Sequence, residues 1–179
     1  EGWSDAFGIL LSSFVKEQDA VFKEYSGYKI LFDFSKIRPA GAEISGGFKD
    51  PGANGLMQSL DKVNNLLEYA CKTSDTISSI CAYDIVMHMA DAVLSGGVRR
   101  SATICLFSHD DQEMIKAKTG DWFIKNPQRG RSNNSAVLIR DHITRDEFAG
   151  FMGSIKEFGE PGFIFADNID YLTNPCAEI

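Results

Sequence analysis

Hydrophobic and polar residues follow helical spacing through most of the first half of the chain. Apolar residues that fall on one helical face predict three helices, over about residues 4–23, 56–67 and 75–93. Between the first two helices, alternating and aromatic apolar residues predict a strand over residues 29–37. Residues 38–55 contain too many glycines and prolines for a regular element and predict a long loop. Loops of this length are uncommon inside a compact domain and tend to be functional.

Strand and helix patterns alternate through the second half. Short apolar runs predict strands over residues 102–107, 135–139 and 163–166. A short acidic helix is predicted after Asp110, and a polar loop near residues 126–134. This alternation is typical of an α/β fold, and it favours parallel pairing of the strands.

The helix predicted between the last two strands, over residues 144–158, has its own start signal. Thr144 and Glu147 form the pattern of a capping box, in which two side chains bond free N–H groups of the first helical turn. Three apolar side chains share one face of this helix: Phe148, Met152 and Ile155.

Composition and charge exclude several classes of protein. The chain has 179 residues, 44% hydrophobic and 24% charged, as in an ordinary globular protein rather than a disordered or fibrous one. Its formal net charge of -7 argues against a nucleic-acid polymer as partner, because such binders gather Lys and Arg against phosphates. The longest apolar runs fall well short of the roughly 20 residues that span a bilayer, so no membrane partner is expected. With no signal-peptide pattern at its start, the protein is expected to be cytoplasmic.

The four cysteines are Cys71, Cys81, Cys105 and Cys176, and no two of them form a C-x-x-C pair. Their spacing is typical of reduced thiols in an intracellular protein and not of a disulfide framework. No metal site is expected, because the three histidines also lack the close spacing of zinc ligands. Cys71, Cys81 and Cys105 fall in apolar helix and strand patterns and are expected to be buried, like small hydrophobic residues.

Residues 95–102, with the sequence SGGVRRSA, form the first candidate binding segment. Its central residues are Gly96, Gly97, Val98, Arg99, Arg100 and Ser101. The glycines allow close approach of the backbone to a ligand, and the adjacent arginines can donate paired hydrogen bonds to phosphate. The other interpretation is a helix end followed by solvated arginines.

Two further segments carry groups that could bind a ligand. The loop at residues 38–55 includes Arg38 and Lys49 and is either a binding loop or a surface Ω-type loop. Near the C-terminus, Asn174, Cys176 and Glu178 occupy alternate positions, so an extended backbone would point all three side chains toward one ligand. The other interpretation of this segment is a frayed polar terminus with an incidental thiol.

Five segments occur in a fixed order along the chain: KIRPAGAEISGGFKDPGANG, DAVLSGGVRRSA, RSNNSAV, FGEPGF and TNPCAEI. Together they resemble the catalytic subunit of a ribonucleotide reductase over nearly the whole chain, and most resemble the adenosylcobalamin-dependent, class II branch. The resemblance implies that residues 1–179 are an internal part of the catalytic domain, a ten-stranded α/β barrel of the ribonucleotide reductase type. Residues 174–179 would then lie on the finger loop at the centre of that barrel.

The resemblance implies a catalytic role for three residues. Cys176 matches the cysteine whose thiyl radical removes the 3' hydrogen of the ribose. Glu178 matches the carboxylate that takes the proton of the 3'-hydroxyl, and Asn174 matches the amide that holds the substrate hydroxyls. These roles agree with the chemistry of the residues, because a carboxylate can act as a general base and a thiyl radical needs a cofactor to generate it. The implied activity is reduction of ribonucleoside di- or triphosphates to deoxyribonucleotides for DNA synthesis.

Partners and cofactor also follow from the resemblance. Residues 95–102 match the family's specificity loop, in which Arg99 would contact the base or phosphates of the ribonucleotide while the backbone senses a deoxynucleotide or ATP effector. Adenosylcobalamin would be the cofactor, held mainly by regions outside this chain, and thioredoxin or glutaredoxin would be the reductant.

Two further cysteines that reduce the substrate in this family fall outside the chain. A thiyl radical without that dithiol could begin a reduction but could not finish it, so activity is expected only with the rest of a reductase chain. Two alternatives stay open: a noncatalytic nucleotide-binding or assembly module, and a class I enzyme whose radical comes from a metal-containing partner subunit.

Overall fold

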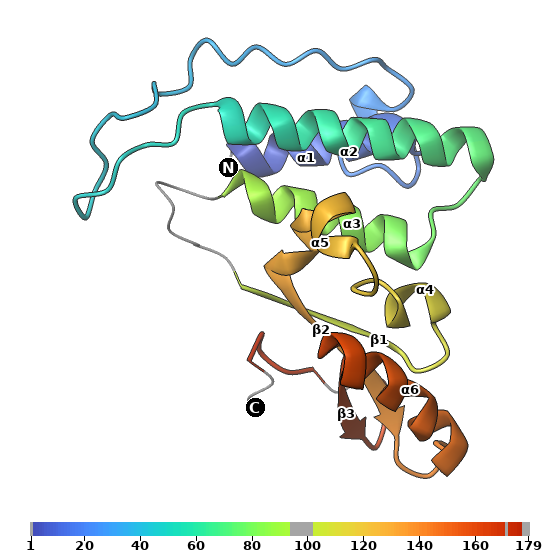
Figure 1. Ribbon diagram of the computed structural model, residues 1–179. Coiled ribbons are helices and arrows are strands. Elements are labelled where there is room, and N and C mark those ends of the chain that lie inside the picture. Colours follow the sequence, from blue (N-terminus) through green and yellow to red (C-terminus); the bar gives the residue numbers. More distant parts are fainter. Residues whose placement is uncertain (1, 94–101, 171, 177–179) are drawn as a thin grey trace. The chain divides into compact units, whose positions relative to one another are not determined.

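The computed structural model describes residues 2–93, 102–170 and 172–176 (Figure 1). These residues form two compact units. Unit 1 contains residues 2–77 and 88–93, and unit 2 contains residues 78–87 together with the described residues from 102 onward. None of the described helices is long and apolar enough to span a membrane.

Unit 1 is built mainly from helices. Helix α1 covers Gly2–Phe14, the 3-10 helix η1 covers Lys23–Tyr25, and α2 covers Asn54–Thr73. Helix α2 confirms the second predicted helix and buries the residues that predicted it: Leu56, Leu60, Val63 and Leu67. It packs against α1, which buries Phe7 and Leu10. Each such side chain contributes about 1.5–3 kcal/mol of hydrophobic stabilisation.

Helix α1 ends at Phe14, so the first predicted helix is too long. The chain turns back after it, and the N–H of Gly27 donates to the carbonyl of Ser13 at 3.1 Å. This bond satisfies a carbonyl group that the helix end would otherwise leave without a partner. Phe22 then lies against Gly8, where an added Cβ would come within 2.5 Å of the phenyl ring. The apolar pattern beyond Phe14 therefore reports packing of the returning chain and not further helical turns.

Residues 28–34 have no regular secondary structure, so the predicted strand over residues 29–37 is wrong. A strand needs a neighbouring backbone to bond its N–H and C=O groups, and none of the described strands pairs with this segment. Leu31 is 86% exposed, so the described residues do not cover this apolar side chain.

The long loop predicted after this segment is confirmed, and it contains a small hairpin. Glu43 and Lys49 form an antiparallel bridge, and the N–H of Ile44 donates to the carbonyl of Phe48 at 3.0 Å. Gly46 and Gly47 at the tip have φ values of 82° and 77°, which glycine adopts without the steric cost of a Cβ.

Unit 2 contains a three-stranded parallel sheet. Strand β1 covers Thr103–Ser108, β2 covers Ser132–Ile139 and β3 covers Gly162–Ala166, in the order β1-β2-β3. Cys105 of β1 is the partner of Asn134 in the first ladder. The predicted α/β class and parallel pairing are confirmed. The sheet is not closed, since β1 and β3 are its edges among the described strands.

Helices connect the strands of unit 2. Helix α3 covers Ser79–Ala92 and begins later than predicted. Its residues 79–87 belong to this unit. The connections between strands contain α4 (Gln112–Ile115), α5 (Trp122–Lys125), η2 (Pro127–Arg131) and α6 (Arg145–Phe158). Helix α4 confirms the predicted short acidic helix, whereas α5 has no counterpart among the predicted elements.

Helix α6 confirms both the predicted helix and its capping box. The N–H of Glu147 donates to Oγ1 of Thr144 at 3.3 Å, and the N–H of Thr144 donates to Oε2 of Glu147 at 2.9 Å. The buried residue of this helix is Phe151, while Met152 is 36% exposed. The core-facing side is therefore turned slightly from the face that the sequence indicates.

Helices cover one face of the sheet. The buried cluster combines residues of α3, of α4 and the turn after it, of α6 and of the strands: Tyr83, Met87, Phe107, Met114, Ala117, Ala136, Leu138 and Phe151. Met87, Ala136 and Leu138 have no exposed surface. Such close packing leaves little freedom for strand β2, which carries the site described next.

Candidate functional site

The described residues at the C-terminal end of unit 2 place Cys176 in a turn. The N–H of Cys176 donates to Oδ1 of Asn174 at 3.0 Å, which is the bond of an Asx-turn. Asn174 and Cys176 therefore do not adopt the extended backbone that would point both side chains to one side. Both are exposed, so the thiol of Cys176 is open to other groups.

Asn133 ties this turn to the sheet. Its Nδ2 donates to the carbonyl of Pro175 at 2.7 Å, across a sequence separation of 42 residues. Asn133 belongs to the RSNNSAV segment and Pro175 to the TNPCAEI segment. The structure thus brings together two of the segments that carry the resemblance.

Strand alternation determines the face from which Asn133 projects. Ser132 and Asn134 are 4% and 2% exposed, on the face that the helices cover. Successive side chains of a strand point to opposite faces, so Asn133 projects from the other face. That face and the segment after β3 line a shallow cleft that includes Val137, Ile139, Ile169 and Leu172. The chain after β3 therefore runs along this second face toward Cys176.

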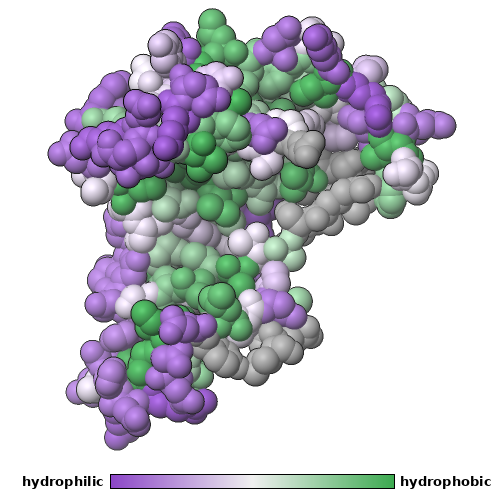
Figure 2. Space-filling view, turned by 180° about the vertical axis from the view of Figure 1, so that it is seen from behind, coloured by the Kyte–Doolittle hydropathy of each residue, from purple (hydrophilic) through white to green (hydrophobic). Residues whose placement is uncertain are grey.

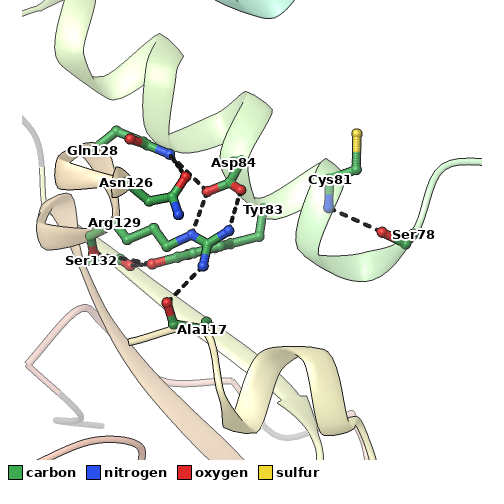
Figure 3. Close-up of polar contacts among 9 residues, drawn as sticks. All are labelled: Ser78, Cys81, Tyr83, Asp84, Ala117, Asn126, Gln128, Arg129 and Ser132. Atoms are coloured by element: carbon green, nitrogen blue, oxygen red, sulfur yellow. Dashed lines mark hydrogen bonds and ion pairs between the residues drawn. The ribbon is translucent and has the colours of Figure 1, made fainter. Parts of the chain in front are cut away.

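Buried hydroxyl groups hold the start of β2 from the helix-covered face. The hydroxyl oxygens of Tyr83 and Ser132 lie 2.9 Å apart, and Oγ of Ser132 donates to Oδ1 of Asn134 at 2.7 Å. Figure 3 shows Tyr83 reaching from α3 to Ser132. Burial raises the pKa of Tyr83 above its ordinary value, so the phenol stays neutral and remains able to donate.

Lys118 adds a buried charge at the same place. Its ammonium donates to the carbonyl of Ser132 and lies 2.8 Å from Oε1 of Glu160. The Lys118 side chain is 4% exposed and that of Glu160 is 25% exposed. A charge buried this deeply needs a partner of opposite sign. Because Glu160 belongs to the FGEPGF segment, a third matching segment meets the start of β2.

A second buried ion pair joins α3 to the segment before β2 (Figure 3). Nη2 of Arg129 lies 2.6 Å from Oδ2 of Asp84, and Nη1 of Arg129 donates to the carbonyl of Ala117 at 2.7 Å. Nε2 of Gln128 also donates to Oδ1 of Asp84, at 3.0 Å. These bonds fix η2, which leads directly into Ser132.

The three remaining cysteines differ in their surroundings. Burial raises the pKa of the Cys105 thiol to about 11, and burial followed by the charge of Asp84 raises the pKa of Cys81. Cys81 and Cys105 are half-buried, and Cys105 packs against the core of unit 2, so their predicted burial is only partly confirmed. Cys71 is exposed, so its predicted burial is wrong. It follows Ala70 on α2, and only Ala70 of the two faces the core.

Several predicted site residues lie outside the described residues. They are Glu178 and the specificity-loop residues Gly96, Gly97, Val98, Arg99, Arg100 and Ser101.

In the loop at residues 38–55, the two cations of interest make ion pairs within the loop. Nη1 of Arg38 lies 3.6 Å from Asp50, and Nζ of Lys49 lies 3.1 Å from Glu43. Both pairs cross the hairpin, so in this structure they hold the loop together.

Asn133 is the site residue that sequence reasoning missed. The run Ser132-Asn133-Asn134 is polar and reads as loop, because asparagine is rare in strands. The one indication in the sequence was the place of Asn133 within the RSNNSAV segment, which is among those that carry the resemblance.

Comparison with known proteins relates the chain to one group of enzymes. It is 32% identical over 200 aligned residues to the adenosylcobalamin-dependent ribonucleoside-triphosphate reductases of Lactobacillus delbrueckii subsp. bulgaricus and Lactobacillus leichmannii. Both alignments cover 100% of this chain and 25% of the relative. The enzyme of the same name from Lactobacillus acidophilus is 30% identical over 169 residues, covering 84% of this chain and 22% of the relative.

These alignments set both the extent and the limit of the relationship. No family model matches the chain, and no solved structure gives a significant match. The chain spans about a quarter of the length of the curated relatives that it matches. Over its own full length, the chain is homologous to the adenosylcobalamin-dependent ribonucleoside-triphosphate reductases.

Proposed function

We propose that this chain supplies the radical-bearing loop and part of the catalytic barrel of an adenosylcobalamin-dependent ribonucleotide reductase. The observation that carries the proposal is the meeting of three matching segments at the start of β2. Asn133 bonds Pro175 beside Cys176, and Lys118 joins Ser132 to Glu160. A loop anchored in this way is suited to chemistry that needs one thiol held in place.

Further strands on the edges of the sheet would complete the barrel. Helix α3 and strand β1 line a largely apolar cleft of about 520 Å³ beside the β1 edge. Hydrophobic side chains exposed in unit 2 include Val86, Phe163, Phe165, Ile169 and Leu172, and hydrophobic surface appears between hydrophilic areas in Figure 2. Open edges with apolar surroundings are usually covered by other structure. This supports further strands beside the sheet in the complete reductase, and the ten-stranded α/β barrel is the form that the resemblance implies for them.

The proposed chemistry uses three residues of this chain. The sulfur radical of Cys176 takes the 3' hydrogen atom of the ribose, so an S–H bond forms and a C–H bond breaks. The carboxylate of Glu178 accepts the proton of the 3'-hydroxyl, and a dithiol outside this chain gives a proton to the 2'-hydroxyl, which leaves as water. The dithiol then gives a hydrogen atom to C2' and an electron to the sugar, and becomes a disulfide. Glu178 returns its proton to the 3' oxygen, and Cys176 returns the hydrogen atom to C3', which restores the sulfur radical. Asn174, whose Oδ1 accepts the N–H of Cys176, would hold the substrate hydroxyls.

The radical source would be held by other parts of the reductase. Adenosylcobalamin, when bound, supplies the organic radical chemistry that side chains cannot start alone. The exposed thiol of Cys176 suits a radical donor that approaches from another segment. The substrate would be a ribonucleoside triphosphate, as in the names of the relatives. Residues 95–102 would form the specificity loop that responds to a deoxynucleotide or ATP effector, and thioredoxin or glutaredoxin would restore the dithiol.

The test is turnover of the complete reductase chain with and without adenosylcobalamin. Replacing Cys176 by Ser is expected to abolish reduction of ribonucleoside triphosphates while leaving effector binding intact. Cys71→Ser is the matched control, because Cys71 is also exposed but lies on α2 in unit 1. Reduction that survives in Cys176→Ser above a few per cent of the wild-type rate would remove the radical role from this residue.

A further inference from the structure

Two asparagine side chains bind the peptide group that joins Pro175 to Cys176. Nδ2 of Asn133 donates to its carbonyl oxygen at 2.7 Å, and Oδ1 of Asn174 accepts its N–H at 3.0 Å. A peptide group is planar, so bonds at its two opposite polar atoms restrain the position of the whole group. The Cα of Cys176 belongs to that plane, so the two bonds also limit where its sulfur can lie.

The two asparagines act over different distances in the sequence. Asn174 is two residues from Cys176 and shapes the turn locally. Asn133 is 42 residues from Pro175 and lies on another element, so it sets where the turn sits on the sheet. The Asn133 bond therefore ties the turn as a whole to strand β2.

Asn133 is itself held firmly by its neighbours. Ser132 and Asn134 on either side are buried, and both take part in the hydrogen bonds around Tyr83. In the β1–β2 ladder Asn133 is the partner of Ile104. Its backbone therefore has a fixed position, and its side chain reaches Pro175 from a rigid base.

We propose that Asn133 is a positioning residue for the radical cysteine, acting through the Pro175–Cys176 peptide group and not through the substrate. This inference rests on the proposed function, since it assigns Asn133 to the same loop. Hydrogen-atom transfer needs donor and acceptor in contact, and a misplacement of about 1 Å at a reacting group can cost about 100-fold in rate. Loss of the Asn133 bond should therefore slow the chemical step while leaving substrate affinity nearly unchanged.

The experiment compares three variants of the complete reductase with the wild type. Asn133→Ser removes the side-chain amide, and Asn133→Gln keeps an amide donor that is one methylene longer. Asn64→Ser is the matched control, because half-buried Asn64 makes its hydrogen bond to Glu68, at 2.9 Å, within α2. The measurements are kcat and KM for a ribonucleoside triphosphate, and the rate of hydrogen exchange at the Cys176 amide.

A positioning role predicts a specific combination of results. Asn133→Ser should lower kcat by about tenfold or more with KM changed less than about twofold, and Asn133→Gln should recover part of the loss. The Cys176 amide should exchange faster in Asn133→Ser, and Asn64→Ser should match the wild type in every measurement. A kcat within twofold of the wild type in Asn133→Ser, or equal losses in Asn133→Ser and Asn64→Ser, would overturn the inference.

Failure of this inference can be told from failure of the proposed function. If Cys176→Ser is inactive but Asn133→Ser retains its kcat, Asn133 has no positioning role and the radical role of Cys176 stands. If Cys176→Ser still reduces substrate, the proposed function fails, and the inference fails with it whatever the exchange rate of the Cys176 amide.

Discussion

Arg129 and Asp84 form a paired contact in which Nε of Arg129 lies 2.8 Å from Oδ1 and Nη2 lies 2.6 Å from Oδ2 of Asp84. The side chains are only 13% and 9% exposed. The pair connects α3 to η2, immediately before the strand that carries Asn133. Its geometry therefore bears on both the stability of unit 2 and the position of the candidate site.

Breaking this pair should destabilise unit 2 strongly. Asp84→Asn leaves the buried guanidinium of Arg129 without a counter-charge, and we expect a loss of about 3 kcal/mol in the free energy of unfolding. Asp167→Asn is the control, because the Arg140–Asp167 pair is 61% and 84% exposed and should contribute less than about 1 kcal/mol. Urea denaturation followed by circular dichroism measures both. Equal small losses in the two variants would contradict the structural role of the Arg129–Asp84 pair.

Two helical glycines should respond in opposite directions to alanine. A Cβ on Gly8 would lie 2.5 Å from the ring of Phe22, so Gly8→Ala must displace that ring and should cost about 1–3 kcal/mol. Gly153 of α6 has no atom within 4 Å of an added Cβ, so Gly153→Ala should add about 0.5–1 kcal/mol of stability. Thermal unfolding of the two variants measures both changes in stability. A neutral Gly8→Ala would show that Phe22 does not pack on α1 in solution.

The elements that sequence patterns predict well are those whose apolar residues are buried within the described chain. Helix α2 and the predicted part of strand β2 fall in this group, with Val63 and Leu138 among their buried residues. The first helix is overestimated because Phe22 packs back onto Gly8 and mimics helical spacing. The segment after it reads as a strand, yet Leu31 is exposed and no described strand pairs with it. Periodicity records which residues are apolar, and it does not record which surface covers them.

The residues of the candidate site also differ in how well the sequence identifies them. Asn174 and Cys176 can be proposed as site residues from the sequence because both lie in one short segment. Asn133 cannot, because its role depends on a contact across 42 residues. The polar start of β2 reads as a loop since the partners that satisfy it, Tyr83 and Lys118, come from other elements. A contact between distant segments appears only once the fold is known.

Replacing Arg99 should test the proposed specificity loop. In the complete reductase, Arg99→Ala is expected to raise KM for a ribonucleoside triphosphate by about tenfold, the typical loss for a charge-assisted hydrogen bond. It should also weaken the response of substrate choice to deoxynucleotide effectors. Arg145→Ala, which removes an exposed arginine at the start of α6, is the control. An effector response unchanged in Arg99→Ala would favour a plain helix end followed by a solvated arginine.

The four cysteines should react with iodoacetamide at different rates and with different pH dependence. The thiolate is the reactive form, and burial raises the pKa of Cys105 to about 11, so very little thiolate forms there near pH 8. Exposed Cys71 and Cys176 should be labelled first, and labelling of Cys105 should keep rising as the pH passes 10.

The raised pKa of Cys105 also has a consequence for stability. The unfolded chain loses the proton of this thiol at a lower pH than the folded chain does. The contribution of Cys105 is therefore complete below the ordinary thiol pKa of about 8.5 and declines as the pH rises toward the folded value of about 11. Cys105→Ala should show a shallower loss of stability over this range in urea denaturation. Labelling of each cysteine by iodoacetamide is measured by mass spectrometry of the native protein. Rapid labelling of Cys105 at pH 8 would show that its thiol is not buried in strand β1.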